Sequence, residues 1–371
     1  MSIDQHLPYD YIYINAFNRL SGIGSHKLHL LDRHFDRFAD AWSADYSTLV
    51  TAGLSASLAT QVIEQRKNID PEIEWGNLQK NNITLITHHD PFFPIQLRDI
   101  TNPPFCLYVR GDASILHLPS VAIVGSRKIS EYGIRATTVF VHDLAHAGIN
   151  IISGLALGTD ITAHRVALAN NGITVAILAG GIDDMSIAPR SHVQVARQII
   201  DHGGALISEY PMSTEPTRGT FPARNRIMAG LTNATIIIEA GEKSGTLITA
   251  TYAAQFKKKI FALPGSIFAP NAFGPNILIR NGIAQPILSS NDVLKMFHKE
   301  HKNVIQRAVP EFASKEEKAL YELINKHPDG IQINHLIKET SLDTNTISST
   351  LTMLELSEFI KNIGNQTYVV I

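Results

Sequence analysis

Residues 121–160 read VAIVGSRKISEYGIRATTVFVHDLAHAGINIISGLALGTD, and this stretch predicts the fold of the central part of the chain. It contains two short apolar runs, at 121–124 and 150–152, each followed by a glycine-containing loop. An amphipathic segment over 133–147 lies between them. Apolar strands joined by a helix are typical of a parallel sheet that helices cover on both faces.

The alternation of strand-like and helical patterns continues to about residue 290. Further strand-like runs lie at 174–178, 205–207, 235–238 and 259–262, and further amphipathic segments at 159–170, 191–202, 222–230 and 244–256. We therefore predict an α/β fold with a doubly wound parallel sheet over residues 71–295.

The two flanks have other patterns. Residues 1–70 are predicted to be helical, and Gly22 and Gly24 between two helical runs suit the turn of a helix-hairpin-helix, whose free N–H groups can meet a phosphate. A small helical bundle with ordinary glycine turns is the alternative. Residues 296–312 are predicted to be a polar linker, and residues 313–371 read as three helices and a hairpin, a winged-helix arrangement.

The charge of the chain is distributed unevenly. The 371 residues suffice for two or three domains and carry a formal net charge of −2. Residues 121–290 hold 14 basic and 10 acidic side chains, whereas residues 1–120 hold 9 and 13, and residues 291–371 hold 9 and 11. A basic sheet domain is where nucleic acid is expected to bind. The predicted recognition helix, residues 343–357, contains no Lys or Arg, so we expect the winged helix to contact protein and not duplex DNA.

Cysteine usage and hydropathy indicate the compartment. Cys106 is the only cysteine, which excludes an internal disulfide and a cysteine-rich zinc site. The first residues lack the pattern of a signal peptide, and the most apolar stretch, 173–182, is about half as long as a membrane helix. We expect a cytoplasmic protein with no membrane partner.

Loops rich in Gly, Ser, Thr and charged residues follow the six predicted strands. These loops are 125–128, 153–160, 179–183, 208–211, 239–246 and 263–266. The carboxyl ends of parallel strands meet at one edge of the sheet, and ligands bind there. Because backbone N–H groups at helix starts attract anions, the loops together predict a long phosphate-binding surface.

Nucleotide-cofactor and metal motifs do not match. The glycines of 154–158 are not spaced as in the G-x-G-x-x-G of dinucleotide folds, and 241–244 lacks the glycine that precedes lysine in a Walker A loop. No cofactor is therefore predicted. His142 and His146 stand four residues apart, but no third ligand is in view, so no metal site is predicted either.

The segment 218–226, RGTFPARNR, places three arginines and an asparagine around one aromatic residue. Arginine binds phosphates in a fork, and Phe221 can stack on a base, which is how single strands are held without sequence readout. The alternative is that Phe221 anchors the core and that the arginines are structural ion-pair partners.

Eight segments of the central part follow one another in a distinctive order and spacing: VAIVGSRKISEYG, SGLALGTDITAH, LAGGID, SEYP, FPARNRIMAGL, IIIEAGEKSGTLITA, FALPGS and GPNILIRNG. Over about residues 75–290 they resemble the DNA-processing protein DprA (Smf) family. The resemblance implies an extended Rossmann-like domain that binds single-stranded DNA and forms a homodimer. It implies a partner, the RecA recombinase, which family members load onto incoming DNA during natural transformation. It also implies an N-terminal SAM-like or helix-hairpin-helix-like domain over residues 1–70 and a C-terminal winged helix over residues 313–371.

The resemblance also implies which residues bind DNA. They are Gly125, Ser126, Arg127, Gly180, Gly181, Arg190, Arg218, Phe221, Arg224, Asn225, Arg226, Lys243, Ser244, Gly245 and Thr246. Among them, Arg127 is expected to contact a phosphate and Phe221 a base, while part of the RNR pattern at 224–226 braces the loop. The family typically shows Tyr-Pro, a basic residue and Asn after LAGGID, whereas this chain has Ala-Pro-Arg-Ser at 188–191. The positive charge is kept at Arg190, whereas Ala188 and Ser191 stand where the family has Tyr and Asn.

An enzyme is the alternative to a DNA-binding recombination mediator. Glu239 follows a predicted strand, a position that suits catalysis on a nucleotide ribose, as in phosphoribohydrolases of the lysine-decarboxylase-like type. That group resembles a PGG-x-GT-x-x-E pattern, whereas Gly245-Thr246 is followed here by Leu-Ile-Thr. We therefore expect no catalytic residues.

Overall fold

The computed structural model describes residues 7–297, 312, 314–327, 330–340, 342–357 and 359–370. The chain divides into two compact units, residues 1–301 and 302–371, and each is described by itself. Of the predicted linker, Met296 and Phe297 pack against the core of the first unit, and residues 298–311 lie outside the described part.

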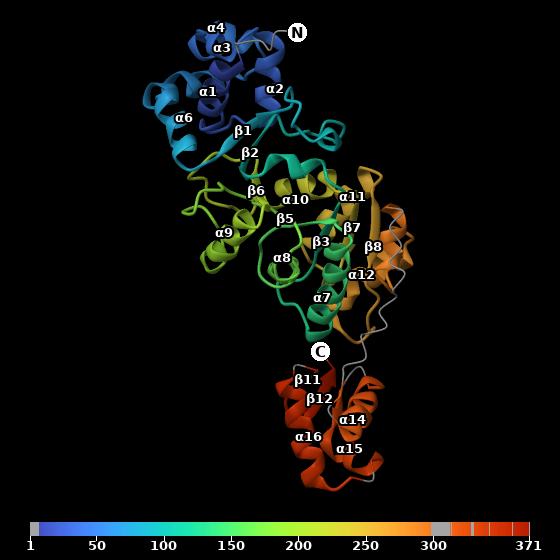
Figure 1. The fold of residues 1–371 in the computed structure, drawn as a ribbon. Coiled ribbons are helices and arrows are strands. Elements are labelled where there is room, and N and C mark those ends of the chain that lie inside the picture. Colours follow the sequence, from blue (N-terminus) through green and yellow to red (C-terminus); the bar gives the residue numbers. More distant parts are fainter. Residues whose placement is uncertain are drawn as a thin grey trace. The chain divides into compact units, whose positions relative to one another are not determined.

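The first unit is built around a nine-stranded sheet (Figure 1). Its strands are β1 (Thr84–Thr87), β2 (Cys106–Gly111), β3 (Ser120–Val124), β4 (Asn150–Ser153), β5 (Thr174–Ile177), β6 (Ala205–Ser208), β7 (Ala234–Ile237), β8 (Lys259–Ala262) and β9 (Gln285–Pro286). They lie in the order β1-β2-β6-β5-β4-β3-β7-β8-β9. The six strands expected from the sequence, β3 to β8, are all present and mutually parallel.

The prediction of a purely parallel sheet is wrong at one edge. Strand β2 pairs antiparallel with β6, and β1 pairs antiparallel with β2. The sequence patterns predict neither strand. Strands β1 and β2 form an antiparallel pair at the edge of the sheet, next to β6. Only a short 3-10 helix, Ile95–Leu97, lies between them in the chain, so the alternation of strand and α-helix that marks the other strands is missing.

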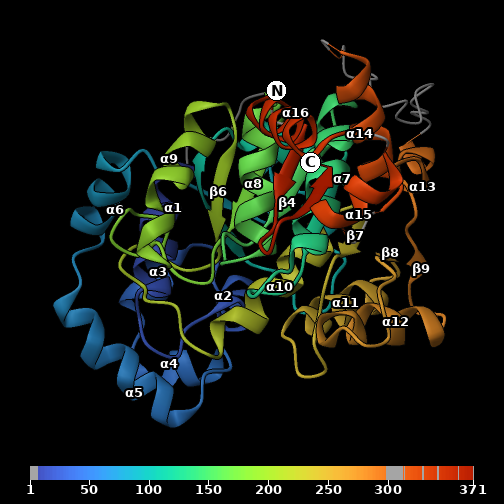
Figure 2. The ribbon, with the colours of Figure 1, turned by 90° about the horizontal axis from the view of Figure 1, so that it is seen from below.

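Helices cover both faces of the sheet (Figure 2). They are α7 (Glu131–His146), α8 (Thr159–Ala169), α9 (Val193–Asp201), α10 (Thr220–Leu231), α11 (Thr246–Gln255), α12 (Phe273–Arg280) and the short α13 (Asn291–Leu294). Helices α7 and α8 share a buried cluster with Val121 and Ile151, while α10 and α11 share another with Ile152 and Ile237. Side chains that alternate along the strands thus point to opposite faces, which makes the fold a mixed α/β sandwich of three layers.

Among the described residues, six α-helices precede the sheet in the chain. They are α1 (Leu7–Asn18), α2 (Ser25–His34), α3 (Phe38–Ser43), α4 (Tyr46–Thr51), α5 (Ala56–Gln65) and α6 (Pro71–Lys80). Phe17, Leu28 and Leu31 belong to the same buried cluster as Tyr108 of β2 and Leu206 of β6. The core of the helices is therefore continuous with the core at the antiparallel end of the sheet.

The second unit has a separate core. It contains α14 (Lys315–Asn325), α15 (Ile333–Glu339), α16 (Thr344–Leu356) and an antiparallel sheet of β10 (Ile331–Gln332), β11 (Ile360–Asn362) and β12 (Thr367–Val370) in the order β10-β12-β11. Leu320, Ile324, Leu351 and Ile360 are completely or almost completely buried in it. The predicted three helices and hairpin are present, and β10 is an addition.

Candidate functional site

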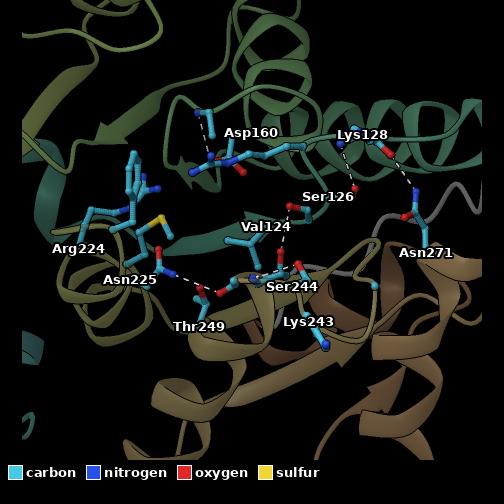
Figure 3. Close-up of a pocket in the computed structure, with 18 residues that line it drawn as sticks. Val124, Ser126, Lys128, Asp160, Arg224, Asn225, Lys243, Ser244, Thr249 and Asn271 are labelled. Atoms are coloured by element: carbon cyan, nitrogen blue, oxygen red, sulfur yellow. Dashed lines mark hydrogen bonds between the residues drawn. The ribbon is translucent and has the colours of Figure 1, made fainter. Parts of the chain in front are cut away.

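A pocket lies where the strand order reverses. From β3 the parallel strands run outward to β6 on one side and to β8 on the other, so the carboxyl ends of β3 and β7 flank the reversal point. A cavity of about 490 Å³ opens there (Figure 3). Its lining combines the loop after β3, the starts of α8 and α10, and the loop between β7 and α11.

Ten of the fifteen predicted residues line this pocket: Gly125, Ser126, Arg127, Phe221, Arg224, Asn225, Lys243, Ser244, Gly245 and Thr246. Five others are not part of its lining: Gly180, Gly181, Arg190, Arg218 and Arg226. Lys128 and Asn271 are lining residues that the prediction omitted. Lys128 could have been predicted, because it directly follows Arg127 in the sequence. Asn271 could not, because it is 143 residues away in the chain, and only the fold brings its Nδ2 to within 2.8 Å of the Lys128 carbonyl oxygen.

Close contact between two loops shapes the floor of the pocket. A Cβ atom on Gly125 would lie 2.3 Å from Thr159 Oγ1, which is closer than such atoms approach. Gly158 has a φ of +77°, and a Cβ atom there would lie 2.2 Å from the Ser126 carbonyl oxygen. Thr246 Oγ1 also donates a 2.9 Å hydrogen bond to the Gly125 carbonyl oxygen. The glycines therefore serve loop packing as well as access to the pocket.

Arg127 and Phe221 form the mouth of the pocket. The Arg127 guanidinium carbon lies 4.9 Å from the centroid of the Phe221 ring, which is cation–π distance. Arg127 is exposed, as are Lys128 and Lys243, and none of the three pairs with a carboxylate among the described residues. Three uncompensated positive charges beside one half-buried aromatic ring can attract an anion and offer a flat apolar surface next to it.

Arg224 is a buried brace. It is only 5% exposed, and its Nη1 donates a 2.5 Å hydrogen bond to the carbonyl oxygen of Ile177 at the end of β5. Asp160, also buried, lies close to this guanidinium and accepts hydrogen bonds from the backbone N–H groups of Gly154 and Ala156. Burial raises the pKa of Asp160, while the charge of Arg224 acts in the opposite direction. A Cβ on Gly154 would overlap the Arg224 guanidinium at 1.7 Å, so the arginine fills this space completely.

The other two residues of the RNR pattern have different surroundings. Asn225 Nδ2 donates a long, 3.4 Å hydrogen bond to the carbonyl oxygen of Gly245 and so links α10 to the start of α11. Arg226 Nη2 donates to both carboxylate oxygens of Glu209 at 2.5 Å. Arg226 and Glu209 line a second cavity, of about 730 Å³, together with the Ser21–Ser25 turn. Arg226 is thus engaged away from the first pocket.

The predicted residues after β5 lie apart from the pocket. Gly180 and Gly181 are buried, and a Cβ on Gly180 would lie 2.5 Å from the carbonyl oxygen of Thr214. Arg190 is exposed in a short 3-10 helix, and its Nη1 donates a 2.6 Å hydrogen bond to the carbonyl oxygen of Asp184. Arg218 is exposed before α10, with no carboxylate partner among the described residues.

Glu239, the residue that suggested an enzyme, holds two loops together. It is 5% exposed, and its Oε2 accepts hydrogen bonds from Ser130 N at 2.9 Å and Asn271 Nδ2 at 3.2 Å. Ser130 Oγ donates to the other oxygen, Oε1. Both oxygens are therefore engaged at the start of α7 and in the loop before α12, and Glu239 is not among the lining residues of the pocket.

A hydropathy search of the described residues finds no helix with the length and apolar character that crossing a bilayer requires.

Comparison with known proteins relates the chain to one group. A family model described as DNA recombination-mediator protein A matches residues 84–298. Protein Smf of a Synechocystis strain is 39% identical over 287 residues, which cover 76% of this chain and 71% of that protein. Protein Smf of Escherichia coli is 39% identical over 239 residues, which cover 64% of this chain and 63% of the relative.

Two solved structures are similar in fold. The X-ray structure of DNA processing protein A (DprA) from Streptococcus pneumoniae superimposes with a TM-score of 0.65 at 29% identity, covering 78% of this chain and 99% of that one. A structure of DNA processing protein A from Helicobacter pylori, described by its single-stranded DNA binding mode, gives a TM-score of 0.52 at 31% identity, with coverage of 58% and 95%.

Proposed function

The chain belongs to the DNA recombination-mediator protein A family, also named DprA or Smf, and on this premise we propose that it binds single-stranded DNA in the pocket at the strand-order reversal. We propose further that it protects incoming DNA and loads the RecA recombinase onto it during natural transformation. It acts by binding and not by catalysis.

The pairing of Arg127 with Phe221 is the observation that carries the proposal. A single strand presents phosphates and unstacked bases at alternating positions, and proteins hold it with cations and aromatic rings in the same groove. Arg127, Lys128 and Lys243 supply charge at the mouth of the pocket, and the ring of Phe221 lies under the Arg127 guanidinium. In the proposed complex a base stacks on Phe221, while Arg127 and the two lysines meet the adjoining phosphates.

The buried polar residues of α10 position this mouth. The hydrogen bond from Arg224 to the carbonyl oxygen of Ile177 and the link from Asn225 to Gly245 hold α10 against the end of β5 and the loop that follows β7. Phe221 stands in the first turn of the same helix. We assign Arg224 and Asn225 to positioning, and Arg218 and Arg190 to an extension of the DNA path beyond the pocket.

The remaining assignments concern partners and domain limits. We propose a SAM-like or helix-hairpin-helix-like domain over residues 1–70, the DNA-binding domain over residues 71–295 and a winged helix over residues 313–371. Residues 311–371 carry five lysines and nine acidic residues, so the winged helix is assigned to protein contacts. A homodimer without membrane association, in the cytoplasm, completes the proposal.

Fluorescence anisotropy of labelled oligo-dT over a salt series tests the DNA-binding proposal. The logarithm of the affinity is expected to fall linearly with the logarithm of salt concentration, with a slope of about −0.7 for each phosphate neutralised. Lys259→Ala is a matched control, because Lys259 is exposed at the amino end of β8, on the opposite edge of the sheet from the pocket. Hydrolysis of a nucleoside monophosphate without oligonucleotide binding would favour the enzymatic alternative instead.

A further inference from the structure

A cluster of histidines and one aspartate lies outside the DNA-binding pocket, between the N-terminal helices and the edge of the sheet. Asp32 belongs to α2, and His88 and His89 follow the last residue of β1. One donor atom from each of these three residues lies within 4.8 Å of the other two. Figure 1 shows α2 beside β1, which joins segments 57 residues apart in the sequence.

The distances in this cluster suit a shared ion. His89 Nε2 lies 3.0 Å from Asp32 Oδ1 and 3.2 Å from Oδ2, and His88 Nε2 lies 3.8 Å from Oδ2. Two ligand atoms on a tetrahedral zinc ion, at ordinary bond lengths, lie about 3.3 Å apart. The three donors are therefore close enough together to share one ion.

A further imidazole stands next to the three residues. His29 is three residues before Asp32 and lies on the same face of α2. The ring centroid of His29 lies 4.8 Å from that of His88, and its Nε2 makes only a long, 3.4 Å contact with the carbonyl oxygen of Pro103. His29 is therefore an additional nitrogen donor adjacent to the cluster.

The cluster is poorly explained as a set of ordinary ion pairs. One carboxylate faces two imidazoles whose ring centroids are only 3.8 Å apart, so protonation of both places like charges together. His88 Nδ1 is buried and has no hydrogen-bond partner among the described residues.

We propose that Asp32, His88 and His89 bind a divalent transition metal of the zinc class, with His29 as the adjacent donor. Two imidazoles and one carboxylate are a ligand set that zinc accepts. The ion ties α2 to the segment that follows β1, and so fastens the N-terminal helices to the antiparallel edge of the sheet. None of these residues lines the DNA-binding pocket, so the site is independent of the proposed function.

Metal titration of the untagged full-length protein, stripped with a chelator, tests this proposal. Co²⁺ is the spectroscopic probe, because its visible absorption changes with the ligands, and Zn²⁺ is then added to displace it. We expect one ion per chain, a higher unfolding temperature with Zn²⁺, and an affinity at least about tenfold lower in Asp32→Asn. The exposed His142→Gln is the matched control, because His142 also lies next to an aspartate and a second histidine.

Two results overturn the proposal. One is the absence of stoichiometric binding by the unmodified chain, and the other is an affinity in Asp32→Asn equal to that of the unmodified chain. If Asp32→Asn fails to fold, His89→Gln replaces it, because the His89 side chain is 57% exposed and its loss leaves the core intact. A loss of binding in His142→Gln alone would move the metal to the other histidine pair and also contradict the assignment.

Discussion

The Arg127 guanidinium carbon stands 4.9 Å above the ring centroid of Phe221, although the two residues are 94 positions apart in the chain. One comes from the loop after β3 and the other from the first turn of α10. Their contact places a cation against an aromatic face in the lining of a pocket. The proposed binding of a single strand therefore has two contributions that can be measured separately, a phosphate contact by Arg127 and base stacking on Phe221.

Arg127→Ala is expected to remove one phosphate contact. The affinity for oligo-dT should fall, and the salt slope should become shallower by about one ion, because slope counts neutralised phosphates. Anisotropy titrations at several salt concentrations measure both quantities. An unchanged salt slope would mean that Arg127 contacts only the Phe221 ring and neutralises no phosphate.

Phe221→Ala is expected to weaken binding by about 1–3 kcal/mol with little change in the salt slope, because stacking on a base releases no counterions. The double variant with Arg127→Ala should lose less than the sum of the single losses, because each partner orients the other. Additive losses, or equal changes of slope in both single variants, would contradict this division of roles.

Arg224→Ala is expected to destabilise the fold by about 3–5 kcal/mol, because it leaves the buried carboxyl group of Asp160 without its cationic neighbour. Urea unfolding measures the loss. Arg218→Ala is the control, since it removes an exposed arginine from the same segment and should weaken DNA binding without changing the free energy of unfolding. A stable Arg224→Ala protein that no longer binds oligo-dT would make Arg224 a direct contact.

Two glycines of the pocket are expected to differ in their tolerance of a methyl group. Gly125→Ala places a Cβ 2.3 Å from Thr159 Oγ1 and should cost about 1–3 kcal/mol of stability as well as affinity for DNA. At Gly245, a Cβ would meet no heavy atom within 4 Å and φ is −59°, so Gly245→Ala should stay within about 0.5 kcal/mol. Urea unfolding of both variants measures the difference. Equal losses of unfolding free energy would contradict the close packing of Gly125 against Thr159.

His164 is expected to make stability depend on pH. Burial lowers its pKa from 6.5 to about 3. Between these two pH values His164 is therefore protonated in the unfolded chain and neutral in the folded chain. The free energy of unfolding should therefore decrease as the pH falls from 6.5 toward 3, by about 1.4 kcal/mol at pH 5.5 from this residue. Urea unfolding of the unmodified chain and of His164→Gln at pH 7.5 and 5.5 tests this, with the exposed His202→Gln as control. Parallel losses in all three proteins would exclude His164 as the cause.

Most of the pocket could be predicted from the sequence, because parallel strands bring their carboxyl ends to one edge. That rule places Gly125 and Thr246 at the same edge of the sheet. The structure adds that β3 and β7 are neighbours, with Thr246 bonded to the Gly125 carbonyl oxygen. Strands β1 and β2 escaped prediction, because antiparallel pairing at a sheet edge leaves no alternation of strand and helix to recognise.

The directions of single side chains required the structure. Arg224 and Arg226 stand two positions apart on α10, so they point about 200° from each other around the helix axis. One consequently meets Asp160 and the other Glu209. The cluster of Asp32, His88 and His89 was equally hidden, because its members come from elements that meet only when the N-terminal helices pack on the sheet.

The core that the N-terminal helices share with the sheet limits how this protein can be divided. A chain starting at residue 84 would keep every residue that lines the pocket at the strand-order reversal, yet it would uncover Tyr108 and Leu206, which are now fully buried. The hydroxyl group of Tyr108 would also lose its hydrogen bond to Asn15, at 2.9 Å. The shortened protein would thus expose an apolar surface along β2 and β6 that favours aggregation. A truncated version of this chain must therefore either retain the helices or carry polar substitutions along these two strands.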